Sequence, residues 1–151
     1  GWSEIKDGVR HAFIWDIEHG MQDIDKHDNR SSEANCINNN GQIVGISFIK
    51  DEGTKIFIWD KENKFKNLTT KDGEMIDVTG INDNGIITGN YKTEGTDTKA
   101  FTIDAKQEIN IIDDHSYAHA INNSGEIAGL SMGIYTVKWI PVIEDNQDET
   151  E

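Results

Sequence analysis

The sequence predicts an all-β protein built from tandem antiparallel repeats of 40 to 44 residues. The first observation is a phrase of the form Ile-Asn-x-x-Gly-x-Ile-x-Gly, which occurs three times, at residues 37–45, 81–89 and 121–129. The second is the even spacing of three phenylalanines, since Phe13, Phe57 and Phe101 lie 44 residues apart. The third is the lack of any long stretch with helical periodicity, which predicts little or no helix.

Each repeat contains four short segments with the composition of β-strands, here named A to D. Strand A carries aromatic and β-branched residues on both faces, as expected of a strand that is buried on both sides. It is predicted at residues 11–15, 55–59 and 99–103. Strand B follows a turn of glycine or polar residues and is predicted at residues 21–24, 65–68 and 109–112.

Strand C has mostly small residues at alternate positions, which predicts that neighbouring repeats approach each other closely there. It is expected at residues 34–37, 78–81 and 118–121, and strand D at residues 43–48, 87–91 and 127–132. The link between C and D carries Asn40-Gly41, Asn84-Gly85 or Ser124-Gly125. An Asn-Gly pair between two strands predicts a hairpin with a type I′ turn, in which both central residues have positive φ.

The repeats predict a single domain over residues 1–143, followed by an acidic tail at 144–151 that we expect to be disordered. The units lie at about 11–48, 55–91 and 99–132, with flanking strands at 1–3 and 136–140. Four-stranded units of this size are typical of β-propeller blades, although the strand order within a unit stays open. Because a ring needs at least about four blades, we expect a fragment of a longer protein or a ring completed by self-association.

The composition excludes some classes of partner. The 151 residues leave room for one domain and carry a net charge of −14, from 28 acidic and 14 basic residues. This charge disfavours nucleic acids and anionic membrane surfaces, and leaves basic proteins, cations or sugars as partners. No apolar run approaches the ~20 residues of a membrane span, so membrane insertion is not expected. Cys36 is the only cysteine and is predicted to be an inert, buried thiol.

One known repeat family shares these motifs. The segment His11-Ala12-Phe13-Ile14-Trp15, followed by Ile37-Asn38-x-x-Gly41-Gln42-Ile43-Val44-Gly45, resembles the HAF repeat of predicted extracellular bacterial proteins. The later units keep the phenylalanine and the Ile-Asn-x-x-Gly phrase but lose the histidine. The resemblance covers about residues 11–132. It implies a propeller-like tandem β repeat that is secreted or located at the cell surface, and it transfers no catalytic residue. The start of the chain shows no signal peptide, and a processed or engineered boundary is expected there.

The asparagine-rich turns could bind calcium or could be purely structural. Residues 82–85 place oxygen-bearing side chains before a glycine, as hard cations require, but the turns at 38–41 and 122–125 contain no carboxylate. We therefore predict structural turns and no cofactor, with Ca²⁺ as the alternative. Asn38, Asn82 and Asn122 are expected to bond to nearby backbone and to fix each hairpin. A ring of amides that faces a ligand is the alternative.

No set of residues in the sequence predicts catalysis or metal binding. His115 and His119 are expected on one face of a strand, about 13 Å apart and therefore too far to share a metal ion. Trp15, Trp59 and Trp139 occupy equivalent strand-A positions, which predicts core packing, with a sugar-stacking platform as the alternative. No carboxylate pair with glycosidase spacing, nucleophile elbow, phosphate-binding loop or dinucleotide fingerprint is present.

Three functional hypotheses follow. The first is a non-enzymatic repeat scaffold that binds a protein or a carbohydrate through the loops that differ between copies. These are the B–C loops at 25–33, 69–77 and 113–117 and the D–A loops at 49–54 and 92–98. The second is a fragment of a hydrolase or lyase with an acidic site at a ring axis. The third is a self-assembling half-propeller, in which incomplete ends pair with another copy.

Overall fold

The computed structural model describes residues 1–27, 30–68, 75–92, 95, 97–131 and 135–139. These residues form strands and turns and contain no helix, which confirms the all-β prediction. The strands are β1 (Trp2–Glu4), β2 (Arg10–Asp16), β3 (Gly20–Asp23), β4 (Arg30–Ile37), β5 (Ile43–Ile49), β6 (Gly53–Asp60), β7 (Lys64–Asn67), β8 (Met75–Ile81), β9 (Ile87–Lys92), β10 (Lys99–Ile103), β11 (Ile109–Asp114), β12 (Ser116–Ile121), β13 (Ile127–Ser131) and β14 (Tyr135–Trp139). The predicted acidic tail lies outside the described residues. The described part of the chain contains no helix that is long and apolar enough to cross a membrane.

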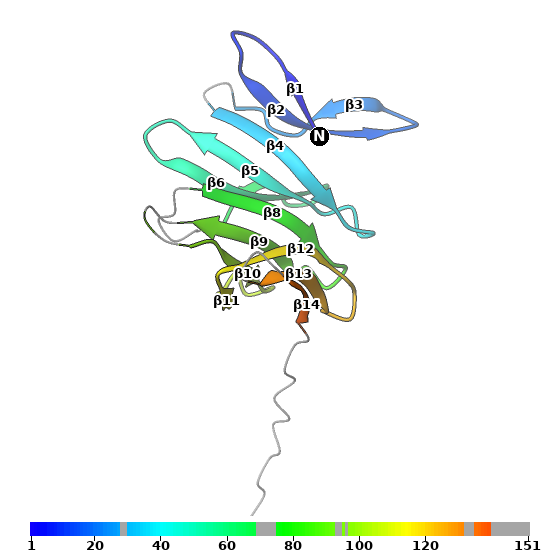
Figure 1. Cartoon of the computed structure of the whole chain (residues 1–151). Helices are drawn as coiled ribbons and strands as arrows, with labels where there is room; N and C mark the ends of the chain where they lie inside the picture. Colours follow the sequence, from blue (N-terminus) through cyan, green and yellow to red (C-terminus); the bar gives the residue numbers. More distant parts are fainter. Residues whose placement is uncertain (28–29, 69–74, 93–94, 96, 132–134, 140–151) are drawn as a thin grey trace, which may run out of the picture.

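The strands form four small antiparallel sheets that follow one another along the chain (Figure 1). The first sheet is β1-β2-β3, the second β4-β5-β6-β7, the third β8-β9-β10-β11 and the fourth β12-β13-β14. In the repeat nomenclature a complete sheet has the order C-D-A-B, so the chain passes to the next sheet at the B–C connection. The first sheet has no C strand and the fourth has no B strand among the described residues. This order was left open by the sequence, because a repeat can be counted from any of its strands.

The hydrophobic core is divided into three layers, one between each pair of successive sheets. Ala12, Ile43, Phe57 and Trp59 pack between the first and second sheets. The second and third sheets enclose the largest cluster, Val44, Ile56, Leu68, Ile76, Val78, Ile81, Ile87, Phe101 and Ile103. A smaller cluster, Ala100, Ala118 and Ile127, lies between the third and fourth sheets. Strand A of an inner sheet therefore buries both faces, as predicted, because it has a sheet on each side. The described residues do not close a ring, and the propeller arrangement stays a prediction.

The repeated glycine of strand D is the direct cross-strand partner of the repeated phenylalanine of strand A. Gly45 pairs with Phe57 and Gly89 pairs with Phe101. A Cβ atom on Gly89 would lie 2.2 Å from the carbonyl oxygen of Asp77 and 2.7 Å from the Phe101 ring. Strand C has a β-bulge immediately after this contact, and the bulge occurs in all three copies. Glycine is required here by close approach of the backbone and the ring.

The C–D hairpins are present, but their predicted turn type is wrong. Gly41, Gly85 and Gly125 have positive φ values of 74°, 77° and 78°, whereas Asn40, the other central residue of the predicted turn, does not. The Gly41 N–H donates to the Asn38 carbonyl oxygen, and the Asn38 N–H donates to the Gln42 carbonyl oxygen. This is a three-residue loop in which a turn of negative φ is followed by one left-handed glycine. The asparagine at position 40 therefore serves hydrogen bonding rather than positive φ.

The equivalent tryptophans of strand A differ in burial. Trp59 is 8% exposed and packs against the first sheet, and Trp139 is half-buried against the fourth-sheet core. Trp15 is 62% exposed, so the prediction of core packing is wrong for this residue. The physical reason is that, in the part of the chain that the structure describes, no sheet covers the face of the first sheet that carries Trp15. The small residues of strand C do permit close approach, since Ile121 lies against Gly80.

Candidate functional site

The three C–D turns are joined to one another by asparagine side chains. Asn38 donates from Nδ2 to the carbonyl oxygen of Asn82 at 2.9 Å, and Asn82 donates from Nδ2 to the carbonyl oxygen of Asn122 at 3.1 Å. The Oδ1 atom of Asn38 accepts the backbone N–H groups of Asn40 and Gln42 within its own turn. The expected local bonding is therefore confirmed for the amide oxygen. The amide nitrogen of Asn38 donates to Gln42 Oε1 in its own turn at 2.8 Å and also to the following repeat. We call the series of amide-to-carbonyl bonds between repeats the asparagine ladder.

Beside the asparagine ladder, the Asp83 side chain accepts hydrogen bonds from both neighbouring turns. Its Oδ1 accepts the Asn39 backbone N–H at 2.9 Å, and its Oδ2 accepts the side-chain amides of Asn39 at 2.8 Å and Asn123 at 2.7 Å. The hydrogen bonds from Asn39 are the main reason that the pKa of Asp83 is lowered, although the side chain lies near solvent. Asp83, the one carboxylate in the second turn, thus bonds to the turns of both neighbouring repeats.

A second set of acids recurs at the A–B turns. Asp16, Asp60 and Asp104 are spaced by 44 residues, and each Oδ1 atom accepts two backbone N–H groups of its own turn. The pKa of Asp60 is lowered chiefly by the side-chain hydrogen bond from Asn63, and that of Asp16 chiefly by the backbone N–H of His19. Sequence reasoning missed these residues, although the spacing of 44 residues could have found them.

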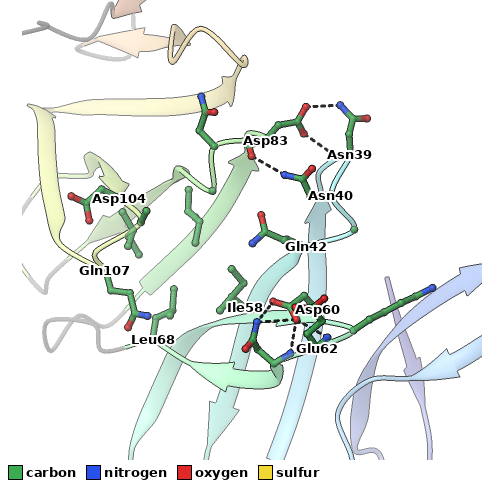
Figure 2. A pocket seen from close by; sticks show the side chains of 18 of the residues that line it. Asn39, Asn40, Gln42, Ile58, Asp60, Glu62, Leu68, Asp83, Asp104 and Gln107 are labelled. Carbon is green, nitrogen blue, oxygen red and sulfur yellow. Dashed lines mark hydrogen bonds between the residues drawn. The ribbon is translucent and has the colours of Figure 1, made fainter.

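The two sets of turns border a groove of about 890 Å³, which we call the turn groove (Figure 2). Its floor is apolar and is formed by Ile14, Ile58, Leu68, Ile87 and Ile103. Its rim is polar and carries Asn39, Asn40, Gln42, Asn63, Asn84 and Gln107. The charged residues of the lining are the carboxylates Asp16, Asp60, Glu62, Asp83 and Asp104 and the single cation Lys61. The turn groove is thus anionic and is built from the same positions of successive repeats.

A smaller pocket of about 350 Å³ lies toward the other end of the strands, and we call it the tyrosine pocket. It is lined by Ile76, Asp77, Asn90, Tyr91, Lys92, Thr98 and Tyr117. Five of these seven residues fall in the B–C and D–A loops in which the sequence predicts binding. Asn90 is buried, and both ends of its side-chain amide are hydrogen-bonded to the backbone of Ala118: Nδ2 donates to the carbonyl oxygen and Oδ1 accepts the N–H. Of these two cavities, the larger therefore lies at the turns that recur in each repeat, and the smaller lies at the variable loops.

The first B–C loop, at 25–33, holds a buried ion pair. The Arg30 guanidinium donates two hydrogen bonds to Asp25, from Nε at 2.9 Å and from Nη2 at 2.7 Å. Burial raises the pKa of Asp25, but the hydrogen bonds from Arg30 and Ser32 outweigh it, so that the pKa is lowered. Arg30 also lies over the Phe65 ring at 4.1 Å. Residues 28–29 of this loop and 69–74 of the second lie outside the described residues.

The histidines are dispersed over the structure. His11 is buried, with Nδ1 2.7 Å from Asp23 and no partner for Nε2 among the described residues. The expectation that His115 and His119 share a strand face is wrong. His115 lies in a turn with φ of 62° before β12, and the bulge between Ala118 and Ala120 interrupts the alternation. Within the described ranges, no three His, Cys, Asp or Glu side chains are grouped as a metal site would require.

Comparison with known proteins does not assign the chain to a family, so its class is defined by its fold. No protein-family model matches the chain, and no curated protein matches it significantly. The fold and the turn groove define a tandem β-repeat protein with an anionic groove formed by repeated turns. The resemblance to the HAF repeat stays a prediction.

Proposed function

We propose that this chain is a non-enzymatic repeat scaffold that binds a basic segment of a protein in the turn groove. The observation that carries this proposal is the lining of the groove, in which five carboxylates face one lysine. A strand or loop with lysine or arginine side chains complements this charge, and the apolar floor would accept the aliphatic parts of the same side chains.

The carboxylates are held in position before any ligand arrives. Asp60 is fixed by Asn63 and by backbone N–H groups, and Asp83 is fixed by Asn39 and Asn123. A positioned side chain loses less conformational entropy on binding than a mobile one. The lowered pKa values of Asp16, Asp60 and Asp83 favour permanent anions. A general acid at neutral pH would need a raised pKa, so these values support binding over a hydrolase or lyase role.

The test is fluorescence anisotropy with a labelled peptide of alternating lysine and threonine residues. We expect binding that weakens by about tenfold or more between ~0.02 and ~0.5 M salt, because exposed charges are screened. The triple variant Asp16→Asn, Asp60→Asn, Asp104→Asn removes three charges and keeps the Oδ1 acceptors of the turns. It should bind the peptide at least about tenfold more weakly, since each lost ion pair contributes up to about 1 kcal/mol.

The matched control removes three charges elsewhere, in the variant Glu4→Gln, Asp51→Asn, Glu52→Gln. These residues are exposed and lie outside the turn groove. Equal weakening in both triple variants would mean that only net charge matters, and would overturn the assignment to the groove. A peptide of alternating glutamate and threonine should not bind.

The tyrosine pocket supports a second candidate, a carbohydrate site. Tyr91 comes from the third sheet and Tyr117 from the fourth, and the Asp77 side chain is exposed beside them. Aromatic faces next to carboxylates are suited to sugar rings. On a glycan array, Tyr117→Ala should abolish any signal that Phe48→Ala, a change at an exposed aromatic outside the pocket, retains. A location outside the cell belongs to the same proposal and rests on the HAF resemblance.

A further inference from the structure

At two of the three interfaces between successive sheets, large residues of one sheet pack on smaller residues of the other. We call the face of a sheet that is directed toward the preceding sheet its upper face, and the opposite face its lower face. The upper face of the second sheet carries Phe57 and Trp59, which pack on Ala12 of the first sheet. The upper face of the fourth sheet carries Ile121, which lies against Gly80 of the third. A Cβ atom on Gly80 would be only 3.0 Å from Ile121 Cγ2, so the small residue makes room for the large one.

The upper face of the first sheet also carries large apolar residues, and no other sheet of the described residues covers them. Ala12 and Ile14 pack toward the second sheet, so the next residue, Trp15, points to the other side. Trp15 pairs with Met21 in the register of β2 and β3, and the two side chains are 62% and 59% exposed. Their equivalents in the second sheet are Trp59, which is buried, and Phe65, which is half-buried. The difference in exposure follows from the covering sheet.

The lower face of the fourth sheet carries small residues, and within the described ranges no further sheet lies over it. Ala128 follows Ile127, which is buried toward the third sheet, and therefore points to the opposite side. Ala128 and Ala120 are exposed. The equivalents of Ala128 in the second and third sheets are Val44 and Thr88, and both are completely buried. The described part of the chain thus ends in two complementary surfaces, one with large and one with small apolar residues.

We propose that the upper face of the first sheet stacks on the lower face of the fourth sheet of a second copy of this chain. The contact continues the interface that already joins successive sheets within one molecule, with Trp15 and Met21 placed against Ala120 and Ala128. It is a heterologous, head-to-tail contact, so each added copy presents a new free end, and the assembly is a closed ring or an open array. This assembly is independent of the ligand of the turn groove.

The test uses one blocking variant for each surface. Trp15→Lys blocks the upper face and Ala128→Arg fills the lower face. We expect the wild-type protein to form oligomers between ~1 and ~100 μM in sedimentation velocity, since contacts of moderate size have micromolar affinity. Each variant alone should be a monomer. An equimolar mixture should form a dimer and stop there, because only one intact upper and one intact lower face remain.

Controls separate this contact from other associations. Phe48→Lys changes an aromatic side chain of similar exposure, 58%, on the second sheet, and should leave the oligomers intact. Circular dichroism checks the fold of each variant, and Met21→Lys replaces Trp15→Lys if the latter does not fold. If the wild-type protein were a monomer at all concentrations, the proposal would be overturned, and these faces would not bind a second copy. So would oligomers of Ala128→Arg alone, which indicate contact between two upper faces, or a mixture that stays monomeric.

Discussion

The side-chain amide of Asn38 donates to the backbone carbonyl of Asn82 at 2.9 Å, across 44 residues of sequence. Asn82 is 2% exposed and makes the same bond to the next copy, so one residue type has two functions. Its oxygen closes its own hairpin, and its nitrogen holds the neighbouring sheet at a fixed distance. This pairing of local and long-range bonds explains why asparagine recurs at a position where serine or aspartate could also cap the turn.

Asn82→Ala should destabilise the protein more than Asn122→Ala. Both changes remove the amide oxygen that accepts N–H groups of the turn, but only Asn82 also donates to another repeat. The Nδ2 atom of Asn122 bonds to Glu126 of its own hairpin. We expect losses of about 2–3 kcal/mol for Asn82→Ala and about 1 kcal/mol for Asn122→Ala in urea unfolding. Equal losses would show that the ladder bond contributes nothing beyond the hairpin.

Gly89→Ala should destabilise the protein strongly, by roughly 3 kcal/mol or more. The new methyl group would overlap the Asp77 carbonyl oxygen, which is backbone of the paired strand β8 and cannot rotate away as a side chain could. The control is Gly53→Ala, where φ is 79° but no atom lies within 4 Å of the added Cβ. Only backbone strain of about 1–2 kcal/mol applies there. Thermal or urea unfolding that ranks the two variants in the opposite order would contradict the close-approach explanation.

Arg30→Met should reverse the pH dependence that Asp25 imparts to stability. In the wild-type protein the pKa of Asp25 is lowered from 3.8, so its contribution is present above pH 3.8 and is lost as pH falls through the lower folded pKa. Without Arg30, the effect of burial on the pKa of Asp25 dominates, and the folded state favours the protonated carboxyl group. The variant should lose roughly 3–5 kcal/mol at pH 7 and recover part of this loss toward pH 3.8.

The control for this experiment is Arg10→Met, which breaks the ion pair with Glu33. That pair is 2.8 Å long but partly exposed, with 47% and 31% of the two side chains accessible. Its loss should cost less than about 1 kcal/mol. Urea midpoints between pH 3 and pH 7 give the comparison. A loss for Arg30→Met that is the same at both ends of this range would show that Asp25 does not titrate as described.

Cys36 should react slowly with a thiol reagent in the folded protein. Burial raises the pKa of the thiol, and the negative charge of Asp77 raises it further, so little thiolate exists at neutral pH. Asp77→Asn should accelerate the reaction, and Asp83→Asn, a charge removed from the turn groove, should not. Absorbance with an aromatic disulfide reagent measures the rate. A wild-type rate equal to that in urea would mean that Cys36 is freely accessible.

Much of the secondary structure was predictable because it depends on local pattern. The strands at 55–59 and 99–103 and the hairpin at residue 41 were expected from β-branched and aromatic residues and from glycine. The type I′ turn was wrong, because the Asn-Gly signal does not distinguish a two-residue loop from a three-residue loop with one left-handed glycine. The strand containing His115 was wrong for a similar reason, since a bulge and a turn break the alternation on which that prediction depended.

The candidate site was predicted less well. The variable loops include part of the tyrosine pocket, but the turn groove is built from the turns that the copies share. Asp60 and Asp104 had no motif around them that indicated a site. The spacing of 44 residues relates these aspartates to one another, but only the tertiary structure shows that the A–B turns lie beside the asparagine ladder.

The class of the fold, the number of repeats and the positions of nearly all strands follow from the amino-acid sequence alone, because they depend on the spacing of 40 to 44 residues between copies and on the turn residues within each copy. The tertiary structure decided which strands share a sheet, which face of each sheet is covered, and where the Asn82 amide donates. The last of these features depends on contacts between residues 40 and 44 positions apart, whereas the strands of one sheet pair over shorter separations. Trp15 and Trp59 illustrate the distinction: they lie at equivalent positions of strand A, and only the sheet above Trp59 makes it a core residue.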